Sequence, residues 1–288
     1  MNSKYVIITP VRDEEAYLHH TVESVVAQTI QPTEWVIVND GSTDNTGRII
    51  DEYAKKFSWI RAVHRPNRGF RKSGGGVVEA FYDGYNSLQT KEWDFLVKLD
   101  GDLNFPPDYF QGCFEHFATE PRLGIGGGDI YHSLAGKLKL EVAPRFHVRG
   151  ATKIYRRACW EAIGGLLTAP GWDTVDEVKA NMLGWSTHSF KELHLVHHRF
   201  TGSADGFLRD RVKYGSVCFI CGYHPLFVLA RCFYRLARKP YILGSLAIVY
   251  GFLKSYFLHT PRVKDKQMIR YLRQQQLRRL CGMQTIWR

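Results

Sequence analysis

The stretch FLVKLDGD, residues 95–102, decides the fold class and points to the chemistry of this chain. Its apolar part has the length and composition of a buried strand, and it stops at two aspartates separated by one glycine. In open α/β sheets, ligands bind beyond the carboxyl ends of the strands, so Asp100 and Asp102 would lie where a ligand binds. Paired carboxylates suit Mg²⁺ or Mn²⁺, ions that proteins commonly share with substrate phosphates. A pattern this short is also typical of a polar turn, so its neighbours must decide.

Strand-like and helix-like segments alternate upstream of these aspartates. We expect strands at residues 5–10, 35–40, 60–64 and 95–99, with a helix after each of the first three. Asp44 is the expected N-cap of the second helix, and the third helix is expected over about residues 73–88. This alternation predicts an α/β fold with a mainly parallel sheet and right-handed crossovers, flanked by helices.

Three polar motifs follow the expected strands: PVRDEE at residues 10–15, NDGSTD at residues 39–44 and DGD at residues 100–102. In this order and spacing they resemble family 2 glycosyltransferases, which have the Rossmann-like GT-A fold. The resemblance covers roughly residues 4–200. It implies a GT-A domain at residues 1–200, followed by a basic, apolar helical extension at residues 201–288.

The resemblance implies a metal-dependent, inverting hexosyltransferase. The donor would be a nucleoside-diphosphate sugar, with UDP favoured and GDP as the alternative, and the acceptor a hydroxyl group of a lipid-linked or growing surface glycan. The residues implied in binding the nucleotide sugar are Pro10, Arg12, Glu14, Asp40, Ser42, Lys72 and Asp100. The residues implied in binding Mn²⁺ or Mg²⁺ are Asp100, Asp102 and His198.

The acceptor side is expected in the middle of the chain. Members of the family commonly carry Glu-Asp at the start of a helix there, with the aspartate as catalytic base. This chain has Val175-Asp176-Glu177 instead, so Asp176 is the predicted base and Glu177 the alternative, with Asp173 in reserve. Arg149 and Trp172 are the residues predicted to contact the acceptor.

Charge is concentrated in the last third of the chain. Residues 199–288 hold 17 lysines and arginines but only 3 aspartates and glutamates, a net charge of +14, whereas the whole chain has +11. The apolar runs 217–230 and 241–253 contain no charged residue, and both are shorter than the roughly 20 residues that a spanning helix needs. We expect a basic, aromatic-rich hairpin on an anionic leaflet, peripheral or monotopic at the cytoplasmic face of the cell membrane. The alternative is a buried helical pair.

Other readings have less support in the sequence. No nucleic-acid-binding motif accompanies the basic charge, and no apolar segment at the start resembles a signal peptide, so the six cysteines are expected to be reduced. A sugar-1-phosphate nucleotidyltransferase would carry a glycine-rich N-terminal signature that this chain lacks. A catalytically inactive, membrane-binding protein of the same fold remains the second alternative.

Overall fold

The computed structural model describes residues 3–70, 74–134, 137–199, 206–236 and 241–287. The chain divides into two compact units, Met1–Arg199 and Phe200–Arg288. Each is considered by itself.

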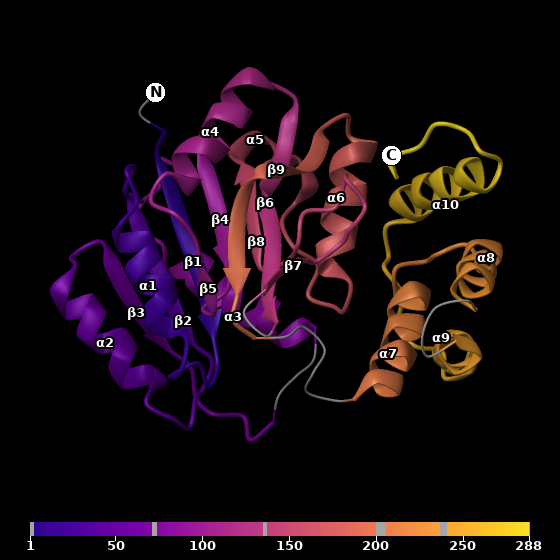
Figure 1. The fold of residues 1–288 in the computed structure, drawn as a ribbon, viewed down its shortest axis with the longest axis horizontal. Helices are drawn as coiled ribbons and strands as arrows, with labels where there is room; N and C mark the ends of the chain where they lie inside the picture. The colour runs from indigo at the N-terminus through magenta and orange to yellow at the C-terminus, as the bar shows by residue number, and fades with distance from the viewer. Residues whose placement is uncertain (1–2, 71–73, 135–136, 200–205, 237–240, 288) are drawn as a thin grey trace. The chain divides into compact units, whose positions relative to one another are not determined.

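The first unit is built on one mixed sheet (Figure 1). Among the described residues the strand order is β3-β2-β1-β4-β8-β6-β9-β5, with β7 beside β6. The strands are β1 (Tyr5–Val11), β2 (Glu34–Asn39), β3 (Ile60–His64), β4 (Phe95–Leu99), β5 (Leu103–Asn104), β6 (Leu123–Leu134), β7 (Lys137–Leu140), β8 (Thr152–Arg156) and β9 (Ser186–His197). Strands β1 to β4 are mutually parallel, whereas β8 is antiparallel to both β4 and β6. The carboxyl ends of β2, β1 and β4 therefore meet at one edge.

Helices cover both faces of this sheet (Figure 1). They are α1 (Leu18–Val26), α2 (Thr46–Lys56), α3 (Gly75–Ser87), α4 (Tyr109–Thr119), α5 (Arg157–Ile163) and α6 (Trp172–Met182). In β1, Tyr5 and Ile7 pack into the core shared with α1, α2 and α4, whereas Val6 and Ile8 pack into the core shared with α3, α5 and α6. A strand buried on both faces needs apolar side chains at successive positions, which explains the continuous apolar runs in the sequence.

The expected α/β fold is confirmed, and the third strand lies at the expected residues. One cap differs from the expectation. Asn45 is the N-cap of α2, and Asp44 lies one position earlier, where its carboxylate accepts hydrogen bonds from the backbone of both Thr46 and Glu15. Asp44 therefore fastens the start of α2 to the loop after β1.

The second unit is helical. It contains α7 (Phe207–Ile220), α8 (Pro225–Arg235), α9 (Tyr241–Phe257) and α10 (Lys266–Leu280). Helices α7 and α9 cross at Gly215 and Gly251, where an added Cβ would lie 2.0 Å from a carbonyl oxygen of the opposite helix. Only glycine permits so close an approach of two backbones. Among the described residues, no helix combines the length and the apolar character needed to cross a membrane.

Candidate active site

The two aspartates after β4 form a cluster with a histidine from β9. Ligand atoms of Asp100, Asp102 and His197 all lie within 4.8 Å of one another. His197 Nε2 is 3.1 Å from Asp102 Oδ2. Burial alone would lower the pKa of His197, but the hydrogen bond and the charge of Asp102 outweigh it, and the pKa is raised. Two carboxylates and an imidazole fit Mn²⁺ or Mg²⁺, particularly an ion that also accepts oxygens from a diphosphate.

Neighbouring groups fix the positions of these aspartates. The Lys98 ammonium is almost fully buried and donates to Asp100 Oδ1 and, at 2.6 Å, to the carbonyl of Gly150. Between the aspartates, a Cβ added to Gly101 would lie 2.4 Å from Val11 Cγ1. A larger residue there would push the pair away from β1, so glycine is required by packing.

The sequence predicted His198 as the histidine of this cluster, and the geometry favours its neighbour. The His198 ring stacks on Tyr17 and His20, with centroid distances of 5.8 and 4.7 Å, while its backbone N–H donates to the Asp102 carbonyl. His197 is the last residue of β9 and His198 lies beyond it, and the imidazole that groups with Asp100 and Asp102 is that of His197. The geometry therefore favours His197 over His198 as the third ligand, and the ligand set stays a prediction.

The predicted nucleotide-binding residues gather at the ends of β1 and β2. Both oxygens of the Asp40 carboxylate are paired, one with Arg65 and the other with Arg68. Arg12 donates to the Asp40 carbonyl at 3.1 Å, and Ser42 Oγ accepts the Asp13 N–H at 3.0 Å. These contacts hold two loops together, and Arg65 and Arg68 are also paired with Asp83 and Glu79.

Further residues complete this edge. Pro10 is buried in β1, and Glu14 is paired with Arg199, whose Nη2 lies 2.8 Å from Glu14 Oε2. Because Arg199 directly follows the His197–His198 pair, this contact ties the end of β9 to the loop after β1. Lys72, also predicted to bind the nucleotide sugar, lies outside the described residues.

The two carboxylates predicted to act as base are both fully buried. Lys153 Nζ, equally buried, lies 2.9 Å from both Asp176 oxygens and 2.9 Å from Glu177 Oε1. Tyr155 donates to Asp176 at 2.6 Å. Burial raises the pKa of Asp176 to about 6, an effect that the charge of Lys153 only partly offsets. Neither carboxylate reaches a surface where an acceptor hydroxyl could meet it.

Asp173, in the first turn of α6, is the one of the three that is partly exposed. A Cβ added to Gly150 would lie 3.5 Å from the Asp173 Cβ, and the Gly150 carbonyl accepts from the same Lys98 that holds Asp100. Asp173 therefore lies beside Gly150, whose carbonyl shares Lys98 with Asp100. A base must touch the hydroxyl that it deprotonates, so exposure favours Asp173 over Asp176 and Glu177, and the base stays a prediction.

The predicted acceptor residues are also engaged within the fold. Arg149 is paired with Glu141, and burial lowers the pKa of its guanidinium. Trp172 is 7% exposed, and its ring lies beneath two ammonium groups, 5.5 Å from Lys98 Nζ and 5.6 Å from Lys153 Nζ. Trp172 thus packs in the core, and its contact with the acceptor stays a prediction.

The sequence reasoning missed Lys98 and Lys153, which organise this region. A signal existed for Lys98, the one charged side chain within the apolar run of β4. A lysine inside a buried strand needs an anionic partner, and Asp100 stands two residues away. For Lys153 the sequence holds no such signal, because its partners are about 20 residues downstream.

Comparison with known proteins agrees with this geometry. The family model for glycosyl transferase family 2 matches residues 6–156, slightly more than half of the chain. Glycosyltransferase GlyG of Streptococcus pneumoniae is 35% identical over 156 residues, covering 45% of this chain and 52% of GlyG. The chain thus spans about half the length of that relative.

Solved structures share the fold at low sequence identity. A mannosyltransferase of Pyrobaculum calidifontis, in complex with GDP-Man and Mn²⁺, is 17% identical and superposes with a TM-score of 0.57 over 88% of this chain and 73% of its own. TarS residues 1–349 of S. aureus, in complex with UDP-GlcNAc, is 16% identical with a TM-score of 0.54 over 93% of this chain and 79% of its own. Both support the same architecture. With more than half of its residues matched by the family model, the chain belongs to glycosyl transferase family 2.

Proposed function

We propose that this chain transfers a hexose from a nucleoside-diphosphate sugar to a hydroxyl group, with inversion and with the help of Mn²⁺ or Mg²⁺. The observation that carries the proposal is the cluster of Asp100, Asp102 and His197 at the sheet edge where the loops around Asp40 also end. Relatives at this level of similarity include a chondroitin synthase of Pasteurella multocida, 29% identical over 41% of this chain and 11% of its own length. That match supports a role in glycan synthesis.

The residues divide the work between the two substrates. Asp100, Asp102 and His197 would hold the metal, which when bound neutralises charge that develops on the departing diphosphate. The loop around Asp40 and Arg12 would hold the nucleoside, with UDP favoured and GDP as the alternative donor. Arg65 and Arg68 already pair with Asp40, so nucleoside contacts to that carboxylate would have to share or replace these ion pairs.

Asp173 would take the proton of the acceptor hydroxyl. Its position in the first turn of α6 places the carboxylate near the positive end of the helix dipole, which stabilises its charged, proton-accepting form. Lys153, held by Asp176 and Glu177, donates to the Asp173 carbonyl at 2.6 Å and so fixes the backbone that carries the base. Asp176 and Glu177 thereby act as positioning residues.

We place the reaction at the cytoplasmic surface of a membrane, with a lipid-linked or growing glycan as acceptor. The support is the net charge of +14 over residues 199–288 together with the apolar side chains exposed on α8 and α9. An anionic leaflet attracts such a segment, and its exposed aromatic and aliphatic side chains would enter the interface.

The test is a donor screen. UDP- and GDP-sugars are incubated with Mn²⁺, and release of the nucleoside diphosphate is measured for the wild type, Asp102→Asn and Asp108→Asn. Asp108 is exposed and its side chain makes no capping hydrogen bond, so this matched control should keep full activity. The rate of diphosphate release by Asp102→Asn should fall about 10²-fold or more, the size of effect expected when one electrostatic contact to the transition state is removed. Equal activity of the two variants, or full activity in EDTA, contradicts the metal role.

A further inference from the structure

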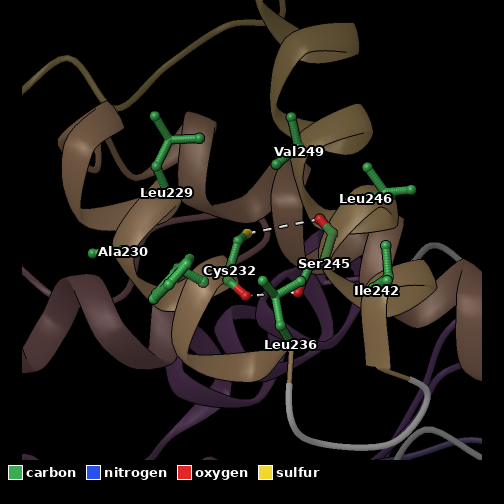
Figure 2. A pocket seen from close by; sticks show the side chains of 9 residues that line it. Leu229, Ala230, Cys232, Leu236, Ile242, Ser245, Leu246 and Val249 are labelled. Carbon is green, nitrogen blue, oxygen red and sulfur yellow. Dashed lines mark hydrogen bonds between the residues drawn. The ribbon is translucent and has the colours of Figure 1, made fainter.

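Helices α8 and α9 line an open groove of ≈ 580 Å³ (Figure 2). On one side the groove is lined by Leu229 and Phe233 of α8 and by Leu236, the C-cap of that helix. On the other side it is lined by Ile242, Leu246 and Val249 of α9. This volume lies in the range of small-molecule pockets, about 300–1,000 Å³. The groove belongs to the second unit and contains none of the catalytic residues.

The polar side chains of the groove are satisfied by each other's backbone. Ser245 Oγ donates to the Cys232 carbonyl at 2.8 Å, and Cys232 Sγ donates to the Ser245 carbonyl at 3.7 Å, the two contacts drawn in Figure 2. Both donors are therefore used within the protein. A ligand in this groove would gain by burying apolar surface rather than by forming hydrogen bonds, so it must itself be largely hydrocarbon.

The helices that line the groove expose apolar side chains and belong to a basic part of the chain. Phe233 is 78% exposed, Ile242 60% and Leu246 58%. Exposed tyrosines stand on the same two helices, namely Tyr234, Tyr241, Tyr250 and Tyr256. Tyrosines are typical of the boundary between water and a bilayer, and the +14 charge of this part of the chain complements an anionic headgroup.

We propose that the groove between α8 and α9 binds the hydrocarbon chain of an anionic membrane lipid. The inference rests on the membrane contact proposed above and deepens it, because it assigns one lipid chain to one cavity. Charge decides against a second copy of the protein as the occupant, since two copies would bring two strongly basic surfaces together.

The test compares two identical substitutions on one helix. Leu246 lines the groove and Leu243 does not, although both lie on α9 and are 58% and 60% exposed. The probe is lauroyl lysophosphatidylglycerol kept below its critical micelle concentration, with binding to the full chain measured by calorimetry. Leu246→Asp should weaken binding about tenfold or more, because it places a charge among the groove's apolar side chains, and Leu243→Asp should change it less than about twofold. The zwitterionic lysophosphatidylcholine should bind the wild type more weakly.

Several outcomes would overturn the proposal. The first is that the wild type does not bind the monomeric lipid, and the second is that Leu246→Asp and Leu243→Asp lose affinity equally. The third is equal affinity of the wild type for the two lysophospholipids. The fourth is a wild-type dimer that Leu246→Asp dissociates. If Leu246→Asp does not fold, Leu229→Asp, from the facing helix and 53% exposed, tests the same groove. Donor turnover with Mn²⁺ is measured in parallel, so a failure of the glycosyl-transfer proposal is recorded separately from a failure of the groove.

Discussion

The assignment of the catalytic base can be tested by replacing two aspartates of α6 separately. Asp173→Asn removes the partly exposed carboxylate in the first turn of the helix, and Asp176→Asn removes the fully buried one. Each replacement keeps the size of the side chain and removes its ability to take a proton. If Asp173 is the base, only the first variant loses transfer.

The structure sets the size of each effect. A positioned base contributes about 10²–10⁴-fold to a rate, so Asp173→Asn should raise the barrier by about 3–5 kcal/mol. Its effect on the free energy of unfolding should stay within about 0.5 kcal/mol, since the side chain is partly exposed and its carbonyl still accepts from Lys153. In Asp176→Asn, Lys153 keeps Glu177 Oε1 at 2.9 Å, so no buried charge is left without a counterion and transfer should fall less than about tenfold.

The assay measures transfer to acceptor together with binding of the nucleoside diphosphate. Asp173→Asn should bind the nucleotide like the wild type, because the base acts on the acceptor. Urea denaturation of both variants checks that lost activity is not lost folding. Full transfer by Asp173→Asn, or abolished transfer by a stable Asp176→Asn, would refute the reasoning and return the role to the buried carboxylates.

Two further predictions concern pH and salt. Burial raises the pKa of Asp176 to about 6, above its ordinary value of 3.8, so the folded state holds this proton more tightly than the unfolded state and the resulting stability is lost as pH rises between these values. Urea titrations measure the free energy of unfolding of the wild type and of Asp176→Asn at several pH values. The free energy of the wild type should fall relative to that of the variant as pH rises across this window. A difference between the two that does not change with pH would contradict the raised pKa. Binding to anionic liposomes, measured by sedimentation, should weaken at high salt without vanishing. Salt screens the cations, whereas the exposed Phe233 and Leu246 would stay inserted in the bilayer. Complete release of the protein by salt would mean that only a peripheral basic patch contacts the membrane.

The fold could be predicted because its signals are local. The runs that became β1, β2 and β4 are buried along their whole length and end in polar motifs, and both features leave a local pattern in the sequence. Asp100 and Asp102 could be singled out for the same reason, since they closely follow their strand. Choosing between His197 and His198 required the orientation of the end of β9, whose last residue is His197. That orientation is set by pairing, which brings His197 opposite Leu103 and His132.

The burial of Asp176 and Glu177 is the part of the candidate site that the sequence could not show. Residues 172–182 contain three acidic side chains, and the sequence does not show which of them faces outward. The answer depends on Lys153, which draws Asp176 and Glu177 into the interior from a strand about 20 residues upstream. Helical spacing alone could not reveal this, because a buried carboxylate is plausible only after its buried counterion is known.

The pairing of β4 with β8 joins these two halves of the site. Lys98 and Lys153 are direct neighbours in that antiparallel ladder, and both ammonium groups approach the Trp172 ring. Like charges opposite each other would destabilise a sheet, so each lysine must find anions of its own. Lys98 pairs with Asp100, a proposed metal ligand. Lys153 pairs with Asp176 and Glu177, on the same helix as the proposed base Asp173. The pairing of Lys98 with Lys153 therefore positions both Asp100, which would hold the metal, and the turn of Asp173, the proposed base. A shift in the register of these two strands would displace both.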